Sequence, residues 1–102
     1  MSHHPYELIT FRWKHIEIEL TYHPCWGVIP DGVMSHLDIK SIDPPRAPLP
    51  ITETGYLSHF FHYTKGDTRE TILKATKDWL DKEAQNEIWK KHEIESNQLS
   101  LF

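Results

Sequence analysis

The sequence contains little of what cross-links a chain or carries it across a membrane. Cys25 is the single cysteine among 102 residues, so no disulfide can form within the chain. No apolar run approaches the roughly 20 residues of a membrane-spanning helix, and no signal-peptide core is present. A glycine-rich phosphate-binding loop is also absent. We therefore expect a protein of the cytoplasm with no membrane segment, and a binding protein rather than an enzyme.

Positive charge is scarce as well. The chain has 11 lysines and arginines against 15 aspartates and glutamates, which gives a formal net charge of −4. This balance provides no overall attraction to nucleic acid or to an anionic membrane. Direct nucleic-acid binding would need a local patch of Arg12, Lys14, Lys40 and the helix lysines, and we do not expect it. Hydrophobic residues make up 38% of the chain, enough for the core of one domain.

Two alternating segments predict antiparallel strands. Residues 11–22 contain Ile, Ile, Leu and Tyr alternating with polar residues, and the phase of the alternation changes near Lys14 and His15. A bulge or a tight turn would explain this change. Residues 35–41 alternate in the same way. The segment 23–32, with two prolines and a Pro-Asp-Gly sequence, predicts the connection between the two strands.

Proline and aromatic residues define the next segments. Residues 43–50 contain four prolines in eight positions, which predicts a loop or polyproline II conformation rather than a central strand. A turn at Thr54 and Gly55 leads into an aromatic, strand-like segment over 56–63. The sheet is therefore expected to contain three to four strands.

The strongest helix pattern starts near Asp67. This residue has the chemistry of an N-cap, and Glu70 completes a capping-box spacing. One apolar stripe follows at helical spacing, formed by Ile72, Ala75, Trp79, Leu80, Ala84 and Ile88. The sequence thus predicts an α+β fold: a small antiparallel sheet, one long helix packed on it, and a short tail. We expect one domain over residues 1–93 and a tail over 94–102.

This tail contains "QLSLF", the residues Gln98, Leu99, Ser100, Leu101 and Phe102. The pentapeptide resembles the motif by which bacterial polymerases, repair proteins and replication regulators dock on the sliding clamp, the ring that tethers DNA polymerase to its template. All five positions fit the consensus, in which Ser or Asp is usual at the third. The resemblance covers five residues. It implies the clamp as a partner, and a role as an accessory factor or competitor in replication or repair.

The residue types suit an extended peptide lying in a groove. Leu101 and Phe102 would fill an apolar cleft and carry most of the binding energy. Gln98 would fix the register, because its amide both donates and accepts hydrogen bonds. Leu99 would pack at the rim, and Ser100 needs only to be small and polar. A single tail of this kind predicts micromolar affinity, roughly −8 kcal/mol. The competing interpretation packs the apolar residues of the tail on the domain's own sheet.

The run "APLPITETGYLSHF" (47–60) is similar to a run in short proteins of bacterial plasmids and other mobile elements, which implies a setting but no activity. The residues leave two interpretations open. One is a structural turn with Gly55 at positive φ and Tyr56 as a buried corner residue. The other is a polar surface site on a rigid loop, formed by Thr52, Glu53, Tyr56, Ser58 and His59.

The alternative function is a small metal-dependent enzyme using Glu53, His59 and His62. On a strand, however, the odd spacing of the two histidines places them on opposite faces. No cysteine pair supports a zinc site either. His15 and His36 fall within the strand patterns and are expected to be partly exposed sheet residues. We therefore expect no metal and no cofactor.

Overall fold

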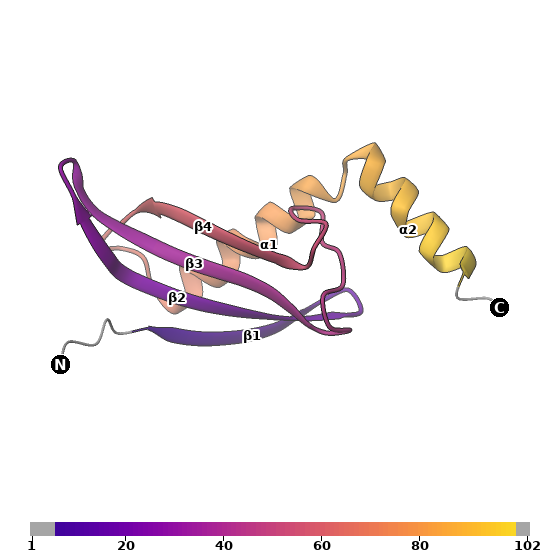
Figure 1. Cartoon of the computed structure of the whole chain (residues 1–102), viewed down its shortest axis with the longest axis horizontal. Helices are drawn as coiled ribbons and strands as arrows, with labels where there is room; N and C mark the ends of the chain where they lie inside the picture. The colour runs from indigo at the N-terminus through magenta and orange to yellow at the C-terminus, as the bar shows by residue number, and fades with distance from the viewer. Residues whose placement is uncertain (1–5, 100–102) are drawn as a thin grey trace.

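A four-stranded antiparallel sheet forms the body of the molecule, and two helices follow it (Figure 1). The computed structural model describes the backbone of residues 6–99 and the side chains of residues 6–95. Across the sheet, in order, lie β1 (Glu7–Trp13), β2 (Ile16–Ile29), β3 (Gly32–Asp43) and β4 (Tyr56–His62). The helices are α1 (Arg69–Glu83) and α2 (Glu87–Leu99). The α+β class and the antiparallel sheet are confirmed, and the prediction of one long helix is wrong.

The change of phase near residue 14 is a tight turn. Lys14 has a φ of 55° and joins β1 to β2, so that Trp13 pairs with Ile16. The connection predicted at 23–32 is wrong in extent, because β2 continues to Ile29 and leaves only a short turn before β3. Between His23 and Gly27 the register shifts, which marks a bulge around Pro24. Proline has no N–H to donate to a strand ladder, so a bulge is where a sheet accommodates it.

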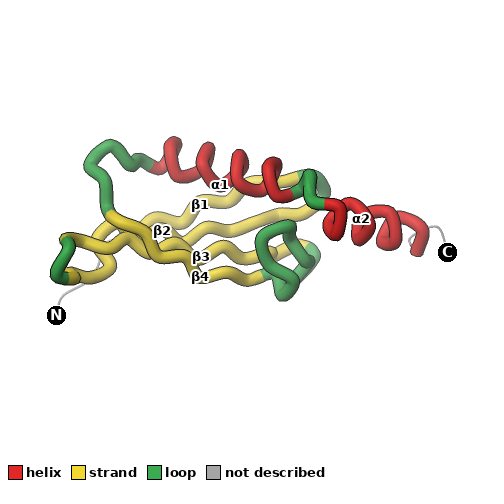
Figure 2. The backbone as a smooth tube through the Cα atoms, turned by 90° about the horizontal axis from the view of Figure 1, so that it is seen from above, coloured by secondary structure: helices red, strands yellow, loops and turns green. Residues whose placement is uncertain are grey.

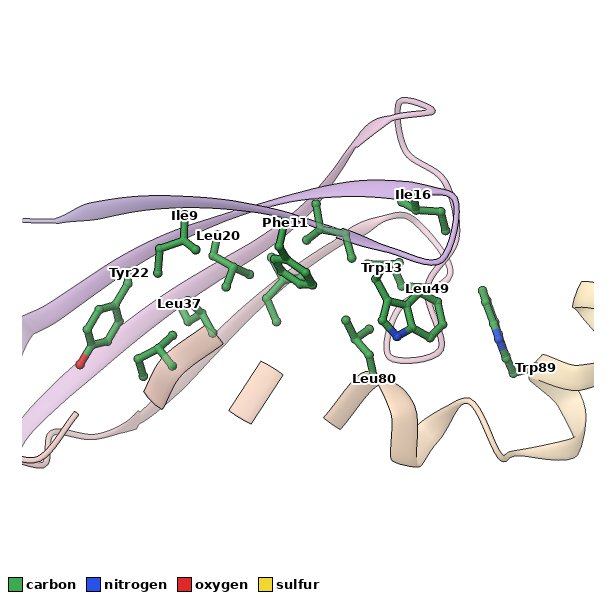
Figure 3. Packing of buried hydrophobic residues seen from close by; sticks show 13 residues of the cluster. Ile9, Phe11, Trp13, Ile16, Leu20, Tyr22, Leu37, Leu49, Leu80 and Trp89 are labelled. Atoms are coloured by element: carbon green, nitrogen blue, oxygen red, sulfur yellow. The ribbon is translucent and has the colours of Figure 1, made fainter. Parts of the chain in front are cut away.

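Alternation divides the sheet into two faces. One face carries Ile18, Leu20 and Tyr22 of β2 with Leu37 and Ile39 of β3, and all five side chains are at most 4% exposed. Helix α1 lies over this helix-covered face, and the buried side chains project toward it (Figures 2 and 3). We call the opposite side, over which neither described helix lies, the open face. The long axis of the molecule is 52 Å, with the β2–β3 hairpin at one end and α2 at the other (Figure 1).

Two serines share the helix-covered face without breaking the core. Ser35 and Ser41 are at most 1% exposed. The Ser35 hydroxyl donates to the Pro24 carbonyl and the Ser41 hydroxyl to the Ala47 carbonyl, each at 2.7 Å. Both acceptors lie in irregular backbone, where a carbonyl is free of the strand ladder. The serines therefore satisfy buried carbonyls and fix the bulge and the proline-rich loop to β3.

The helix interruption has a local cause. Helix α1 begins one residue later than predicted, because Thr68 rather than Asp67 is the N-cap and forms a capping box with Thr71. It ends at Glu83 with Ala84 as its C-cap, and the Asn86 side chain then accepts from the Ile88 amide at 2.7 Å, which caps a new helix. The restart turns Trp89 toward the core and leaves Ile88 77% exposed. Within the described residues, neither helix has the length and apolar composition of a membrane span.

Residues 44–55 form a loop that is held by main-chain hydrogen bonds, as the prolines indicated. Leu49 and Thr52 exchange two of these bonds (2.8 and 3.0 Å), and Leu49 is 2% exposed. The Ser41 amide donates to the Gly55 carbonyl at 2.8 Å, and the Arg46 amide to the Ser41 carbonyl at 3.2 Å. The loop is therefore a fixed part of the domain that delivers the chain into β4.

Tyr22 gives the core a testable pH dependence. Its side chain is 1% exposed, and its hydroxyl has no well-formed hydrogen bond to any described residue. Burial raises the pKa of the phenol, and the nearby Ser35 hydroxyl opposes this rise. The folded state holds the phenol proton more tightly than the unfolded state does. The protonated Tyr22 therefore contributes its full share of stability below about pH 10, and this share is lost as the pH rises through the pKa of Tyr22 in the folded state.

We therefore expect Tyr22→Phe to change the free energy of unfolding by no more than about 1 kcal/mol near neutral pH, since no hydrogen bond is lost. Above about pH 10 the variant should become the more stable chain. Urea unfolding of the parent and of Tyr22→Phe, once near neutral pH and once above about pH 10, measures the difference in their free energies of unfolding. Tyr6→Phe, at a position 57% exposed, is the control and should show no such crossover. A constant difference across this range would contradict the prediction.

Candidate functional site

The segment predicted as a polar surface site is rigid but does not form one site. The Thr52 hydroxyl donates to the Tyr56 carbonyl at 2.8 Å, which fixes the turn into β4. Tyr56 is 49% exposed, so its placement as a buried corner residue is wrong. Tyr56 and Ser58 lie on the open face, whereas His59 lies on the helix-covered face, where its ring contacts Trp79 at 5.1 Å. Strand alternation thus separates these candidates.

The proposed pairing of His59 with His62 meets the same obstacle. The two histidines have opposite parity on β4. Glu53 is in the preceding loop, where it lines a groove with Trp89 and His92. Among the described residues, no group of three closely spaced metal-ligand side chains contains Glu53, His59 or His62. The geometry therefore gives no support to a metal centre built on these three residues.

The structure instead brings together His23, His36 and Asp38 on the open face. His36 and Asp38 are two residues apart on β3, and His23 lies directly opposite His36 on β2. One potential ligand atom from each residue lies within 4.8 Å of the other two. Nε2 of His36 is 3.3 Å from Oδ1 of Asp38. Three groups able to bind a cation thus converge at one point of the sheet.

Hydroxyl groups from β4 hold this arrangement. The Tyr56 hydroxyl donates to Oδ1 of Asp38 at 2.7 Å, and this bond raises the pKa of the tyrosine. The Ser58 hydroxyl is hydrogen-bonded to Nε2 of His36 at 2.5 Å. Both are neighbours of β3 by strand register, so their positions follow from the backbone. The carboxylate and the imidazole are therefore oriented before any ligand arrives.

Aromatic rings surround the imidazole of His36. Its centroid lies 4.6 Å from that of Trp26 and 4.5 Å from that of Phe60. Trp26 and Phe60 are 43% and 49% exposed, but His36 is only 6% exposed, so its expected partial exposure is wrong. We call this group the His36 cluster: His23, Trp26, His36, Asp38, Ser58 and Phe60.

The His36 cluster does not have the arrangement of a Ser-His-Asp hydrolase. In such a triad the serine and the carboxylate contact different nitrogens of the imidazole. Here Ser58 and Asp38 both approach Nε2 of His36. Nδ1 of His36 has no hydrogen-bond partner among the described residues. The geometry thus offers cation ligands and a hydrogen-bonded imidazole, but no charge relay.

The sequence reasoning missed this cluster, although part of the signal was visible. The His-x-Asp spacing at 36 and 38 puts both side chains on one strand face. The position of His23 could not be read from the sequence, because the bulge between His23 and Gly27 changes which residue of β3 lies opposite it. Continuing the Gly27–Met34 register four residues back along β2 would place His23 opposite Asp38 rather than His36.

The basic residues considered for nucleic-acid binding have acidic neighbours. Arg12 lies 3.6 Å from Glu17, and Lys14 lies 2.8 Å from Glu93. Lys40 is opposite Glu19 in the strand register. These carboxylates offset the positive charge locally, and the structure gives no argument for a basic surface on this part of the chain.

The predicted docking pentapeptide lies mainly outside the described residues. The backbone of Gln98 and Leu99 belongs to the last turn of α2, so the helix continues past the predicted domain limit at residue 93. Ser100, Leu101 and Phe102 are outside the described range. Among the described residues, Trp89 is the last side chain of the core.

Comparison with protein families identifies the family of the chain. A family model described as the KlcB third domain matches residues 6–89, from the start of β1 into α2. The chain belongs to this family. No curated protein and no solved structure matches it. The matched range includes every position of the His36 cluster and ends before Gln98.

Proposed function

We propose that this protein is a non-enzymatic binding module that docks on the bacterial DNA polymerase sliding clamp through Gln98–Phe102. The observation that carries the proposal is the complete match of these five residues to the clamp-docking motif. Their position supports it. The pentapeptide begins nine positions after Trp89, the last core residue among the side chains that the structure describes.

Binding requires part of α2 to unwind. A clamp-bound peptide is extended, whereas Gln98 and Leu99 are helical in the free chain. The last turn of a helix has carbonyls without intrahelical partners and frays at low cost. Unwinding this turn therefore leaves room for micromolar affinity, with Kd on the order of 1–100 μM.

The KlcB family gives the proposal a setting, because the family is plasmid-related. A plasmid protein that occupies the clamp groove either recruits the domain to replicating DNA or excludes other clamp-binding proteins. Exclusion needs little beyond the pentapeptide, whereas recruitment needs a second binding surface on the domain. The open face is the candidate for that surface, because it exposes Tyr56, Phe60 and Trp26.

The test is calorimetric titration of a purified bacterial sliding clamp with the intact protein. The variant Leu101→Ala/Phe102→Ala should bind at least about 100-fold more weakly, because both anchor side chains are lost. The control is Ile94→Ala, which removes an apolar side chain on α2 that is 57% exposed and should leave affinity unchanged. The melting temperatures of all three chains should agree. No binding by the intact protein at about 100 μM, or equal binding by the double variant, would refute the proposal.

A further inference from the structure

We propose that His23, His36 and Asp38 form a binding site for a divalent transition-metal ion of the Zn²⁺ class. The site lies on the open face, within the KlcB domain and far along the chain from the pentapeptide. It is therefore independent of clamp docking.

The distances fit a metal site that closes on its ion. With metal–ligand distances of about 2.0–2.2 Å, the ligand atoms around a tetrahedral ion lie roughly 3.3–3.6 Å apart. The separation between His36 Nε2 and Asp38 Oδ1, 3.3 Å, is already in this range. The three ligand atoms lie within 4.8 Å of one another, so closure needs a side-chain movement of little more than 1 Å.

The donor types select the class of ion. Two imidazoles and one carboxylate suit Zn²⁺, Fe²⁺, Co²⁺ and Ni²⁺, whereas Mg²⁺ and Ca²⁺ prefer sites built from oxygen alone. Three protein ligands leave a coordination position for water or for a group from a partner. The rings of Trp26 and Phe60, which pack beside His36, are 43% and 49% exposed, so the cluster borders the surface of the molecule.

The surroundings of the ligands match those of known metal sites. Metal-binding carboxylates and imidazoles are usually held by a second layer of hydrogen bonds. Here the Tyr56 hydroxyl donates to Oδ1 of Asp38. The Ser58 hydroxyl is hydrogen-bonded to Nε2 of His36, the nitrogen that faces Asp38, so an ion bound at Nε2 would replace this bond.

The test titrates the intact protein with Zn²⁺ by calorimetry and with Co²⁺ by visible absorption. All chains carry His3→Gln and His4→Gln, because these adjacent histidines bind metal ions on their own account. We expect one ion per chain with Kd on the order of 1 μM or below, and a Co²⁺ spectrum of four-coordinate type. Zn²⁺ should also raise the melting temperature, because the ion binds only the folded arrangement.

Single substitutions then identify the ligands. His23→Gln, His36→Gln and Asp38→Asn should each weaken Zn²⁺ binding by about 100-fold or more, since second-layer losses alone cost 10- to 100-fold. The matched controls are His59→Gln on the helix-covered face and His62→Gln on β4, and these should bind as the parent does. If His36→Gln fails to fold, His23→Gln and Asp38→Asn still decide, because both residues are only half-buried. A parent chain with no saturable binding below about 100 μM, or ligand variants that bind as the controls do, would overturn the proposal.

Discussion

The substitution Gly55→Ala is expected to lower the free energy of unfolding by about 3–4 kcal/mol, a large share of the roughly 5–15 kcal/mol typical of a domain. Gly55 has a φ of 75°, where a residue with a Cβ pays about 1 kcal/mol or more. An added Cβ would lie 2.6 Å from the carbonyl carbon of Arg46 and 2.7 Å from its Cα. These are backbone atoms, so they cannot rotate away as a side chain does.

The clash matters because Gly55 closes the proline-rich loop. Its carbonyl accepts from the Ser41 amide, and a shift there disturbs the start of β4. Urea unfolding of Gly55→Ala measures the loss. The control is Gly66→Ala, because an added Cβ at Gly66 meets no atom within 4 Å. The control should change stability by no more than about 0.5 kcal/mol. Equal urea midpoints for Gly55→Ala and Gly66→Ala would contradict the prediction and would mean that the backbone at Arg46 can shift at little cost.

Replacement of Trp89 by alanine is expected to release α2 from the domain at a cost of about 3–5 kcal/mol. Trp89 is 8% exposed, and its ring lies 5.9 Å from that of Trp13. Figure 3 shows it at the edge of the core, beside Leu49 and Trp13. Among the described residues, an ion pair between Lys14 and Glu93 also joins α2 to the turn after β1, and this pair is partly exposed and worth at most about 1 kcal/mol.

The matched control is Ile88→Ala on the preceding residue, which is 77% exposed. Urea unfolding gives the stability of each variant, and far-ultraviolet circular dichroism gives its helix content. Trp89→Ala should lose both stability and helix, because an isolated helix of this length is marginal in water. Ile88→Ala should lose neither. If both variants kept the parent's helix content, the attachment of α2 would have to come from elsewhere.

Local patterns were sufficient to predict most of the sheet. Ile18, Leu20 and Tyr22 alternate strictly, and all three lie in the core. The single helix was predicted because Ala84 and Ile88 continue the apolar stripe. The prediction of a continuous helix was wrong there, because the side-chain oxygen of Asn86 accepts a hydrogen bond from the Ile88 amide. This local interaction competes with continuation of the helix. The spacing of apolar residues indicates where a helix can continue, but it does not detect a side chain that caps a new helix.

The candidate metal site was beyond prediction for a different reason. A strand pattern shows which face a histidine occupies, but the pairing register decides what lies beside it. His23 meets His36 only because the bulge after it shifts the register. The burial of His36 depends likewise on Trp26 and Phe60, which come from two other strands. Both properties arise from tertiary structure.

The length of the molecule has a consequence for how its two binding regions would work together. His36 lies four residues into β3 from the hairpin end, whereas α2 lies at the opposite end of the molecule, whose long axis is 52 Å (Figure 1). Ligands at the two regions would not compete for space. A chain docked through the pentapeptide after α2 would instead keep any ligand bound near the hairpin end at high local concentration beside the docking partner. If both proposals hold, the protein would act as a connector between two ligands that bind at opposite ends of the molecule.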